Sequence, residues 1–317
     1  MTISSVASAD AKHPEFIWRN KEIVSWEKAM VHVNSVGHAS VSSVFEGIKA
    51  YWNKEEQQLY IFRLREHMQR MLDSFRMVRL GNELSLEELE NGVIDILRAN
   101  KTKQDTYIRP WAFAKGFVHE QMVPADAPTE VVIDSWPFQT HMLTDRGCKV
   151  CISSWTRISD NVMPPRAKVF SNYHNGRMAL MEAKTNGFDY PVFLNERHKI
   201  TEGPGACVAM VRNGKVVTPN TTSGVLESIT RESLLRLIPE VLNVQVIERE
   251  VDRTELYVAD EIFFIGTGWE VLPIVNIDGL TVGNGKMGPV ARAIDRAYHD
   301  VVRGINDCYK EWRAPVW

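Results

Sequence analysis

The sequence has little cysteine and no excess of charge of either sign. Four cysteines among 317 residues are too few for a disulfide framework, which favours a reducing compartment such as the cytoplasm. The 37 Lys and Arg residues nearly balance the 40 Asp and Glu residues, so the formal net charge is −3. Nucleic-acid-coating proteins carry a basic excess, so this class is excluded. A hydrophobic content of 44% also excludes a disordered chain.

Long apolar runs are missing as well. No segment approaches the roughly 20 apolar residues that a membrane-spanning helix needs. The stretch from Met1 to His13 has no apolar core of a signal peptide, and we expect a frayed tail there. Cys148 and Cys151 form a C-x-x-C without a second ligand pair, so we interpret them as strand residues and predict no metal site.

Several nucleotide and hydrolase motifs are absent or lie in the wrong context. Gly283, Gly285 and Gly288 match G-x-G-x-x-G, but they follow a predicted hairpin near the C-terminus instead of opening a first strand–helix unit. We interpret them as a loop that leads to the last helix. Walker loops, H-E-x-x-H and G-x-S-x-G do not occur, so nucleotide hydrolysis, zinc proteolysis and α/β-hydrolase chemistry have no support.

Helix and strand patterns mix along the chain without regular alternation, which indicates an α+β fold of about two domains. Ser85 and Glu88 form a capping-box pattern before one helix, and Pro239 is expected to close another. The expected helices are 65–78, a helix from Leu86, 172–184, 231–238 and 289–303. The clearest expected strands are 106–114, 129–134, 149–154, 207–212 and 261–265. The aperiodic stretch 136–145 is expected to connect an N-terminal domain (1–135) to a C-terminal domain (146–317).

Three polar residues stand where chemistry is possible. Lys168 lies between apolar residues before a predicted helix, where burial could turn it into a usable amine, although most such lysines extend to solvent. Glu202 sits among turn formers, a pattern that a solvated turn also produces. Thr230 lies in the first turn of a helix, whose free N–H groups attract phosphate.

In their order along the chain, these pieces resemble the fold-type IV family of enzymes that use pyridoxal 5′-phosphate, most closely its branched-chain-aminotransferase group. The resemblance covers almost the whole chain. It implies two lobes, a small N-terminal α/β domain and a larger C-terminal domain with a β-barrel-like sheet. The motifs that carry it are Ser43–Ile48, Arg65–Met71, Tyr107–Pro110, Ala167–Lys168 with Asn172–Tyr173, Thr201–Gly205, Ile229–Arg231 and Ala259–Phe263.

The resemblance implies a role for each matching residue. Lys168 would be the catalytic residue, which forms the Schiff base with the cofactor and moves the proton. Glu202 would pair with the pyridine nitrogen, and Tyr173 with the phenolic oxygen of the ring. The phosphate would be held by Arg70, Ile229, Thr230 and Thr267. The substrate side would be formed by Phe45, Tyr107, Arg109, Gly268 and Trp269.

The implied reaction is a ping-pong transfer of an amino group from an amino acid or amine to a 2-oxo acid, by a homodimer. Three positions depart from the family pattern: Ser40 replaces a tyrosine, Cys207 an asparagine and Trp269 a small residue. The donor therefore stays open. Alternatives within the fold are an (R)-selective amine transaminase that uses pyruvate or 2-oxoglutarate, a D-amino-acid transaminase and aminodeoxychorismate lyase. A degenerate binding module is a further alternative, which the intact Lys168 and Glu202 oppose.

Overall fold

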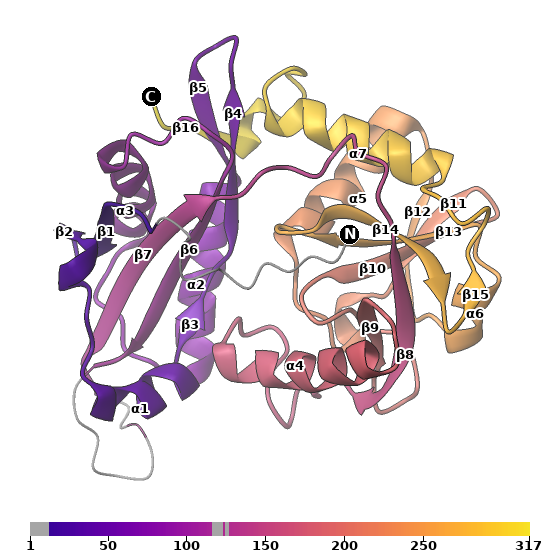
Figure 1. The fold of residues 1–317 in the computed structure, drawn as a ribbon, viewed down its shortest axis with the longest axis horizontal. Coiled ribbons are helices and arrows are strands. Elements are labelled where there is room, and N and C mark those ends of the chain that lie inside the picture. The colour runs from indigo at the N-terminus through magenta and orange to yellow at the C-terminus, as the bar shows by residue number, and fades with distance from the viewer. Residues whose placement is uncertain (1–12, 116–122, 124–126) are drawn as a thin grey trace.

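The computed structural model describes residues 13–115, 123 and 127–317, which form two lobes, each built on one sheet (Figure 1). Most of the segment expected to be a frayed tail lies outside the described residues. Within the described residues, each of the two sheets has eight strands. The first has the order β16-β5-β4-β6-β7-β1-β2, with β3 paired to β6. Its strands are β1 (Phe16–Arg19), β2 (Glu22–Ser25), β3 (Val44–Phe45), β4 (Ile48–Asn53), β5 (Gln58–Phe62), β6 (Thr106–Ala114), β7 (Thr129–Pro137) and β16 (Arg313–Pro315).

The second sheet has the order β12-β11-β10-β13-β14-β8-β9, with β15 paired to β14. Its pairings are mixed: β13 and β14 are antiparallel, whereas β8 is parallel to both β14 and β9. Its strands are β8 (Cys148–Thr156), β9 (Tyr190–Leu194), β10 (Cys207–Arg212), β11 (Lys215–Thr218), β12 (Val246–Glu248), β13 (Glu261–Gly266), β14 (Glu270–Ile277) and β15 (Leu280–Thr281). The predicted mixture of helices and sheets is confirmed.

Helices cover the sheets, and α2, α3 and α7 are amphipathic. On α2, the buried His67, Met71 and Phe75 repeat at helical spacing and pack toward the first sheet. The predicted capping box of α3 is present, with Ser85 and Glu88 each accepting a backbone N–H of the other. The helices are α1 (Val36–Val41), α2 (Leu64–Val78), α3 (Leu86–Ala99), α4 (Phe170–Thr185), α5 (Ile229–Leu242), α6 (Arg253–Tyr257) and α7 (Pro289–Val302).

One predicted helix end is wrong. Helix α5 does not close at Pro239 but continues to Leu242. A proline inside a helix removes one backbone hydrogen bond, but Leu242 still packs against the buried apolar cluster around Leu237 and Ile238. The helix ends instead at Asn243, whose φ of 53° is left-handed.

The chain crosses between the two lobes at two places. Strand β7 runs through Pro137, two residues into the stretch expected to be the connection, and β8 starts only at Cys148. The segment 138–147 between them crosses from one lobe to the other near α7 (Figure 1). At the C-terminus, β16 returns to the first sheet and pairs with β5. The exact domain boundaries stay a prediction.

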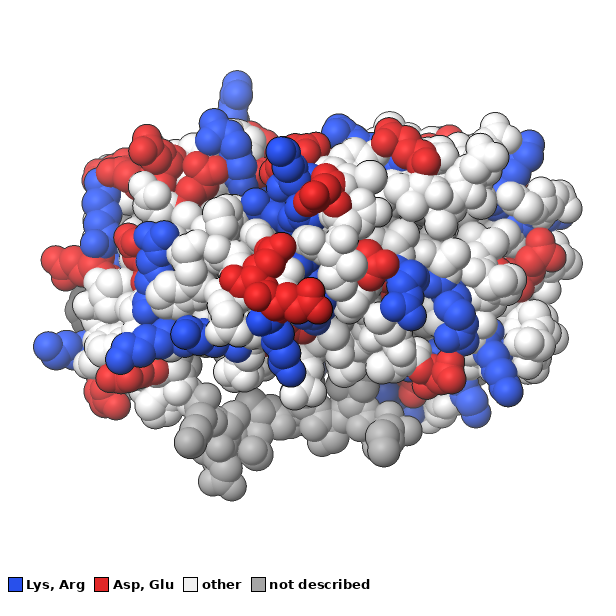
Figure 2. Space-filling model, turned by 90° about the horizontal axis from the view of Figure 1, so that it is seen from above, with Lys and Arg blue, Asp and Glu red and all other residues white. Residues whose placement is uncertain are grey.

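The remaining sequence features have ordinary structural positions. Cys148 and Cys151 lie on β8, and all four cysteines are free thiols. The glycine-rich stretch leads into α7, as expected, with Gly288 as the residue before its first turn. None of the described helices is long and apolar enough to cross a membrane. Lys, Arg, Asp and Glu side chains intermingle on the face shown in Figure 2.

Candidate active site

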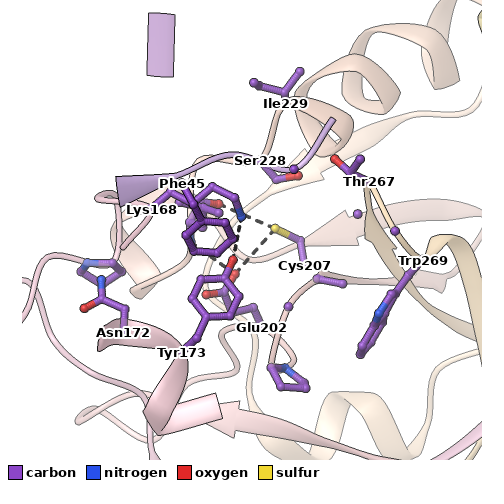
Figure 3. A pocket seen from close by; sticks show the side chains of 18 of the residues that line it. Phe45, Lys168, Asn172, Tyr173, Glu202, Cys207, Ser228, Ile229, Thr267 and Trp269 are labelled. Carbon is purple, nitrogen blue, oxygen red and sulfur yellow. Dashed lines mark hydrogen bonds between the residues drawn. The ribbon is translucent and has the colours of Figure 1, made fainter. Parts of the chain in front are cut away.

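Hydrogen bonds hold the backbone N–H and carbonyl of Lys168, and its side chain points into a cavity between the lobes. Its N–H donates to the Ser74 hydroxyl on α2 (3.1 Å), and its carbonyl accepts the N–H of Phe45 on β3 (2.9 Å). The amine donates to the Tyr173 hydroxyl at 2.7 Å and lies 4.7 Å from the centre of the Phe45 ring (Figure 3). Tyr173 is on the first turns of α4, so the helix that follows the lysine brings its partner back to it.

Glu202 lies opposite this amine and is buried. Its Oε1 is 2.7 Å from Nη2 of Arg157, and its Oε2 accepts the N–H of Leu226 at 3.2 Å. Burial raises the pKa of Glu202, and the Arg157 guanidinium opposes that rise. The Cys207 thiol is 3.9 Å from Oε2 of Glu202, and burial raises the pKa of this thiol to about 12. The Cys207 thiol therefore lines the cavity as a neutral group.

Arg70 forms a cationic corner of the cavity. Its guanidinium makes two 2.8 Å hydrogen bonds to the carboxylate of Glu46, and Nη1 donates to the Glu227 carbonyl at 2.7 Å. His67 binds the same carboxylate through Nδ1 at 2.8 Å. Burial alone would raise the pKa of Glu46, but Arg70 and His67 hold that pKa well below its usual range. A buried carboxylate thus fixes the direction of the arginine.

The start of α5 faces the same corner. Ser228 is the N-cap of this helix, and Ile229 opens it, so the backbone N–H groups of the first turn have no partner within the helix. Ser228, Ile229 and Thr267 lie together on this side of the cavity (Figure 3). Thr230 lies behind them, with its hydroxyl 3.5 Å from that of Thr267. This combination of a cation, hydroxyls and a helix N-terminus suits an anion.

Aromatic side chains line another part of the cavity. The Tyr107 ring packs on Trp136 (5.0 Å between centroids) and faces Gly47, where a Cβ atom would lie 1.9 Å from the tyrosine hydroxyl. Trp269 packs on Tyr190 at 4.3 Å. Gly47 therefore makes room for Tyr107.

The structure brings most of the predicted residues to this cavity. Ten of them line it: Phe45, Arg70, Tyr107, Lys168, Tyr173, Glu202, Ile229, Thr267, Gly268 and Trp269. Arg109 does not: it pairs with Asp134 on β7 (2.8 Å) and borders another hollow. Ser40 is on α1, exposed, and its hydroxyl donates to the Gly37 carbonyl.

Sequence reasoning missed two charged residues of the site, Glu46 and Arg157. Glu46 is the one acid in the otherwise apolar run Val44–Ile48, which was a usable signal of a buried functional carboxylate. Arg157 follows strand β8 with no such signal. Among the described residues, no group of three or more His, Cys, Asp or Glu side chains is arranged to hold a metal ion.

Comparisons with known proteins agree with this geometry. The family model for amino-transferase class IV matches residues 43–277. The branched-chain amino acid aminotransferase of Thermobaculum terrenum, solved in its PLP-form, is 44% identical, with a TM-score of 0.94 over 96% of this chain and 99% of that one. A probable branched-chain-amino-acid aminotransferase of Aquifex aeolicus is 37% identical over 96% of this chain and 97% of its own length. The Escherichia coli K12 branched-chain-amino-acid aminotransferase is 35% identical over 96% and 98%. The chain therefore belongs to the class IV aminotransferases.

Proposed function

We propose that the protein is a branched-chain amino acid aminotransferase, which uses pyridoxal 5′-phosphate to move an amino group to a 2-oxo acid by a ping-pong mechanism. The observation that carries this proposal is the convergence of Lys168, Tyr173, Glu202 and Arg70 on one cavity. These four groups come from three separate parts of the sequence. Their convergence supports a single chemical purpose, and the names of the similar proteins support the substrate class.

The donors around the cavity fit the proposed cofactor. Arg70 and the first turn of α5 offer a cation and free N–H groups suited to a phosphate dianion. Glu202, held by Arg157, offers a carboxylate suited to a protonated ring nitrogen. When bound, pyridoxal phosphate would supply an aldehyde carbon for the amine and a cationic ring that accepts electrons.

The chain itself would move and control the protons. Lys168 would carry a proton at Nζ, because this amine is the basic group that reaches the middle of the cavity. The Tyr173 hydroxyl, 2.7 Å away, would hold Nζ in one direction. Burial raises the pKa of Glu202, and Arg157 would oppose that rise and so favour the carboxylate form.

The aromatic residues on the substrate side of the cavity, called the substrate wall below, support an amino donor with an apolar side chain. Phe45, Tyr107 and Trp269 carry no formal charge and line the cavity with aromatic rings. An aliphatic branched side chain is suited to such a wall, because burial of its apolar surface is favourable. This assignment of the wall, like each role given above to a single residue, belongs to the proposal.

We also propose a cytoplasmic homodimer. Several apolar side chains near the first sheet are exposed, and such a cluster is typical of a protein–protein contact. They are Trp26, Met30, Val31, Val33, Val36 and Val41. The free thiols support a reducing compartment.

Steady-state kinetics with two varied substrates test the function. We expect parallel double-reciprocal lines for L-leucine, L-isoleucine or L-valine with 2-oxoglutarate, as in a ping-pong reaction. Release of pyruvate without amino transfer would instead identify a lyase. Activity with D-amino acids or (R)-1-phenylethylamine, and none with branched-chain L-amino acids, would overturn the proposed donor.

A further inference from the structure

A buried ion pair joins the two lobes next to the cavity. Nζ of Lys49 on β4 is 2.5 Å from Oε1 of Glu270, the first residue of β14. The exposed fractions of the two side chains are 1% and 0%. Neither residue lines the cavity, and the chemistry proposed above uses neither. Removing two charges from water is costly, so we expect this buried pair to have a specific role.

Glu270 has a backbone conformation that glycine favours. Its φ is 56°, and it follows the turn of Thr267, Gly268 and Trp269 that lines the cavity. Gly266 pairs with Glu270 across β13 and β14, so the turn is a three-residue hairpin loop. Such loops commonly end with a left-handed residue, usually glycine. A glutamate at this position therefore indicates that its side chain is needed there.

The carboxylate of Glu270 also holds the segment that connects the two sheets. Oε1 accepts the Thr140 hydroxyl at 2.7 Å, and Oε2 accepts the His141 N–H at 2.8 Å. Arg146 approaches Oε2 at 3.8 Å. One buried acid thus links β4, the connecting segment 138–147 and the turn that lines the cavity.

Lys49 reaches Tyr107 through aromatic contacts. Its Nζ is 4.9 Å from the centre of the Phe138 ring, and that ring is 5.6 Å from the ring of Tyr107. Tyr107 lines the cavity, whereas Phe138 and Lys49 stand behind it. Loss of the ion pair would therefore loosen two parts of the substrate wall, the one that carries Tyr107 and the one that carries Trp269.

We propose that Lys49 and Glu270 are positioning residues for the substrate. Their ion pair holds the 267–269 turn and Tyr107 at the separation that the substrate requires. This inference rests on the proposed function. It assigns the pair no contact with substrate or cofactor. Its loss should therefore weaken substrate binding while cofactor binding and the chemical step stay nearly unchanged.

The test uses the cofactor-loaded enzyme and the variants K49M, K49R and E270Q. We expect K49M and E270Q to raise the KM values of L-leucine and 2-oxoglutarate about tenfold or more, with kcat within about threefold of wild type. Calorimetric titration with 4-methylvalerate, which is leucine without its amino group, should show the same loss of affinity without turnover. K49R keeps the charge but has a bulkier head group, so its KM values and its affinity for 4-methylvalerate should lie closer to those of wild type than those of K49M do.

A double variant and a control separate positioning from stability. K49M/E270M replaces the pair by apolar groups, which often leaves stability unchanged, and we expect its KM to stay raised. E261Q alters another buried carboxylate of the same sheet, which binds two N–H groups at the start of α7, and should leave KM unchanged. Wild-type KM values and 4-methylvalerate affinity in K49M/E270M would overturn the inference. An inactive wild-type enzyme would overturn the proposed function instead.

Discussion

The amine of Lys168 donates a 2.7 Å hydrogen bond to the hydroxyl of Tyr173, five residues along the chain. The Phe45 ring packs against both partners, 4.7 Å from the amine and 4.9 Å from the tyrosine ring. A lysine side chain has four rotatable bonds and loses much entropy when it is held. Tyr173 and the Phe45 ring restrict the amine to one direction, toward Glu202 and the middle of the cavity (Figure 3).

Substitution Y173F tests this restriction. Because a hydrogen bond to a charged group contributes about 1.5–3 kcal/mol, we expect kcat/KM for L-leucine to fall roughly ten- to hundredfold. Y190F is the matched control, because it removes a hydroxyl from a tyrosine that packs behind Trp269 and does not line the cavity. Equal activities of the two variants in steady-state assays would contradict the role of Tyr173.

Arg70 and Arg166 offer a second matched pair. Both bind Glu227, Arg70 through the backbone carbonyl and Arg166 through the carboxylate, but only Arg70 lines the cavity. We expect R70Q to weaken binding of pyridoxal phosphate about hundredfold, because a charge-assisted contact with the phosphate is lost. R166Q should bind it as wild type does. Equilibrium dialysis measures both constants, and similar constants would count against an anion corner at Arg70.

Local patterns in the sequence predicted much of this fold. Strands β6 and β10 have the expected bounds, because alternation and turn residues are local signals. The extension of α5 past Pro239 was not predictable in this way, since it depends on the packing of Leu242 in a distant cluster. Propensity is a weak prior that tertiary contacts override.

Two glycines test the shape of the substrate wall. A Cβ at Gly47 would lie 1.9 Å from the Tyr107 hydroxyl, whereas one at Gly268 would lie 3.7 Å from the same ring, an ordinary contact. We therefore expect G47A to displace Tyr107 and raise the KM of L-leucine at least about tenfold, while G268A changes it less than about threefold. Circular dichroism verifies that both variants are folded. The opposite order of KM values would show that Tyr107 does not define the wall.

Asp295 gives a prediction on pH. Burial raises the pKa of Asp295 to about 6, and the Leu143 N–H that its Oδ2 accepts opposes that rise. An acid whose pKa is higher in the folded state contributes stability below its unfolded pKa, and this stability is lost as the pH rises through about 6. The D295N side chain stays neutral at both pH values. We expect the free energy of unfolding of D295N, relative to that of wild type, to be about 1–2 kcal/mol higher at pH 8 than at pH 4.5. Urea unfolding at both pH values measures this difference, and a pH-independent effect would contradict it.

The sequence showed the residues of the cavity one short segment at a time. Lys168 and Tyr173 are five residues apart on one segment, so the sequence displays them together. Lys49 and Glu270 are 221 residues apart, and each alone is an ordinary charged residue. Arg109 shows the converse limit: its motif matches the family, yet in the structure its guanidinium pairs with Asp134 away from the cavity. Contacts between distant segments depend on tertiary packing, which no local pattern encodes.

The most direct test of the central claim is a half-reaction without an acceptor. Wild-type enzyme loaded with pyridoxal phosphate is mixed with L-leucine, and the visible absorbance of the bound cofactor is followed. We predict that this absorbance disappears while one 4-methyl-2-oxopentanoate forms per site, and that K168A forms none. Full turnover by K168A, with the visible absorbance of wild type, would contradict the account.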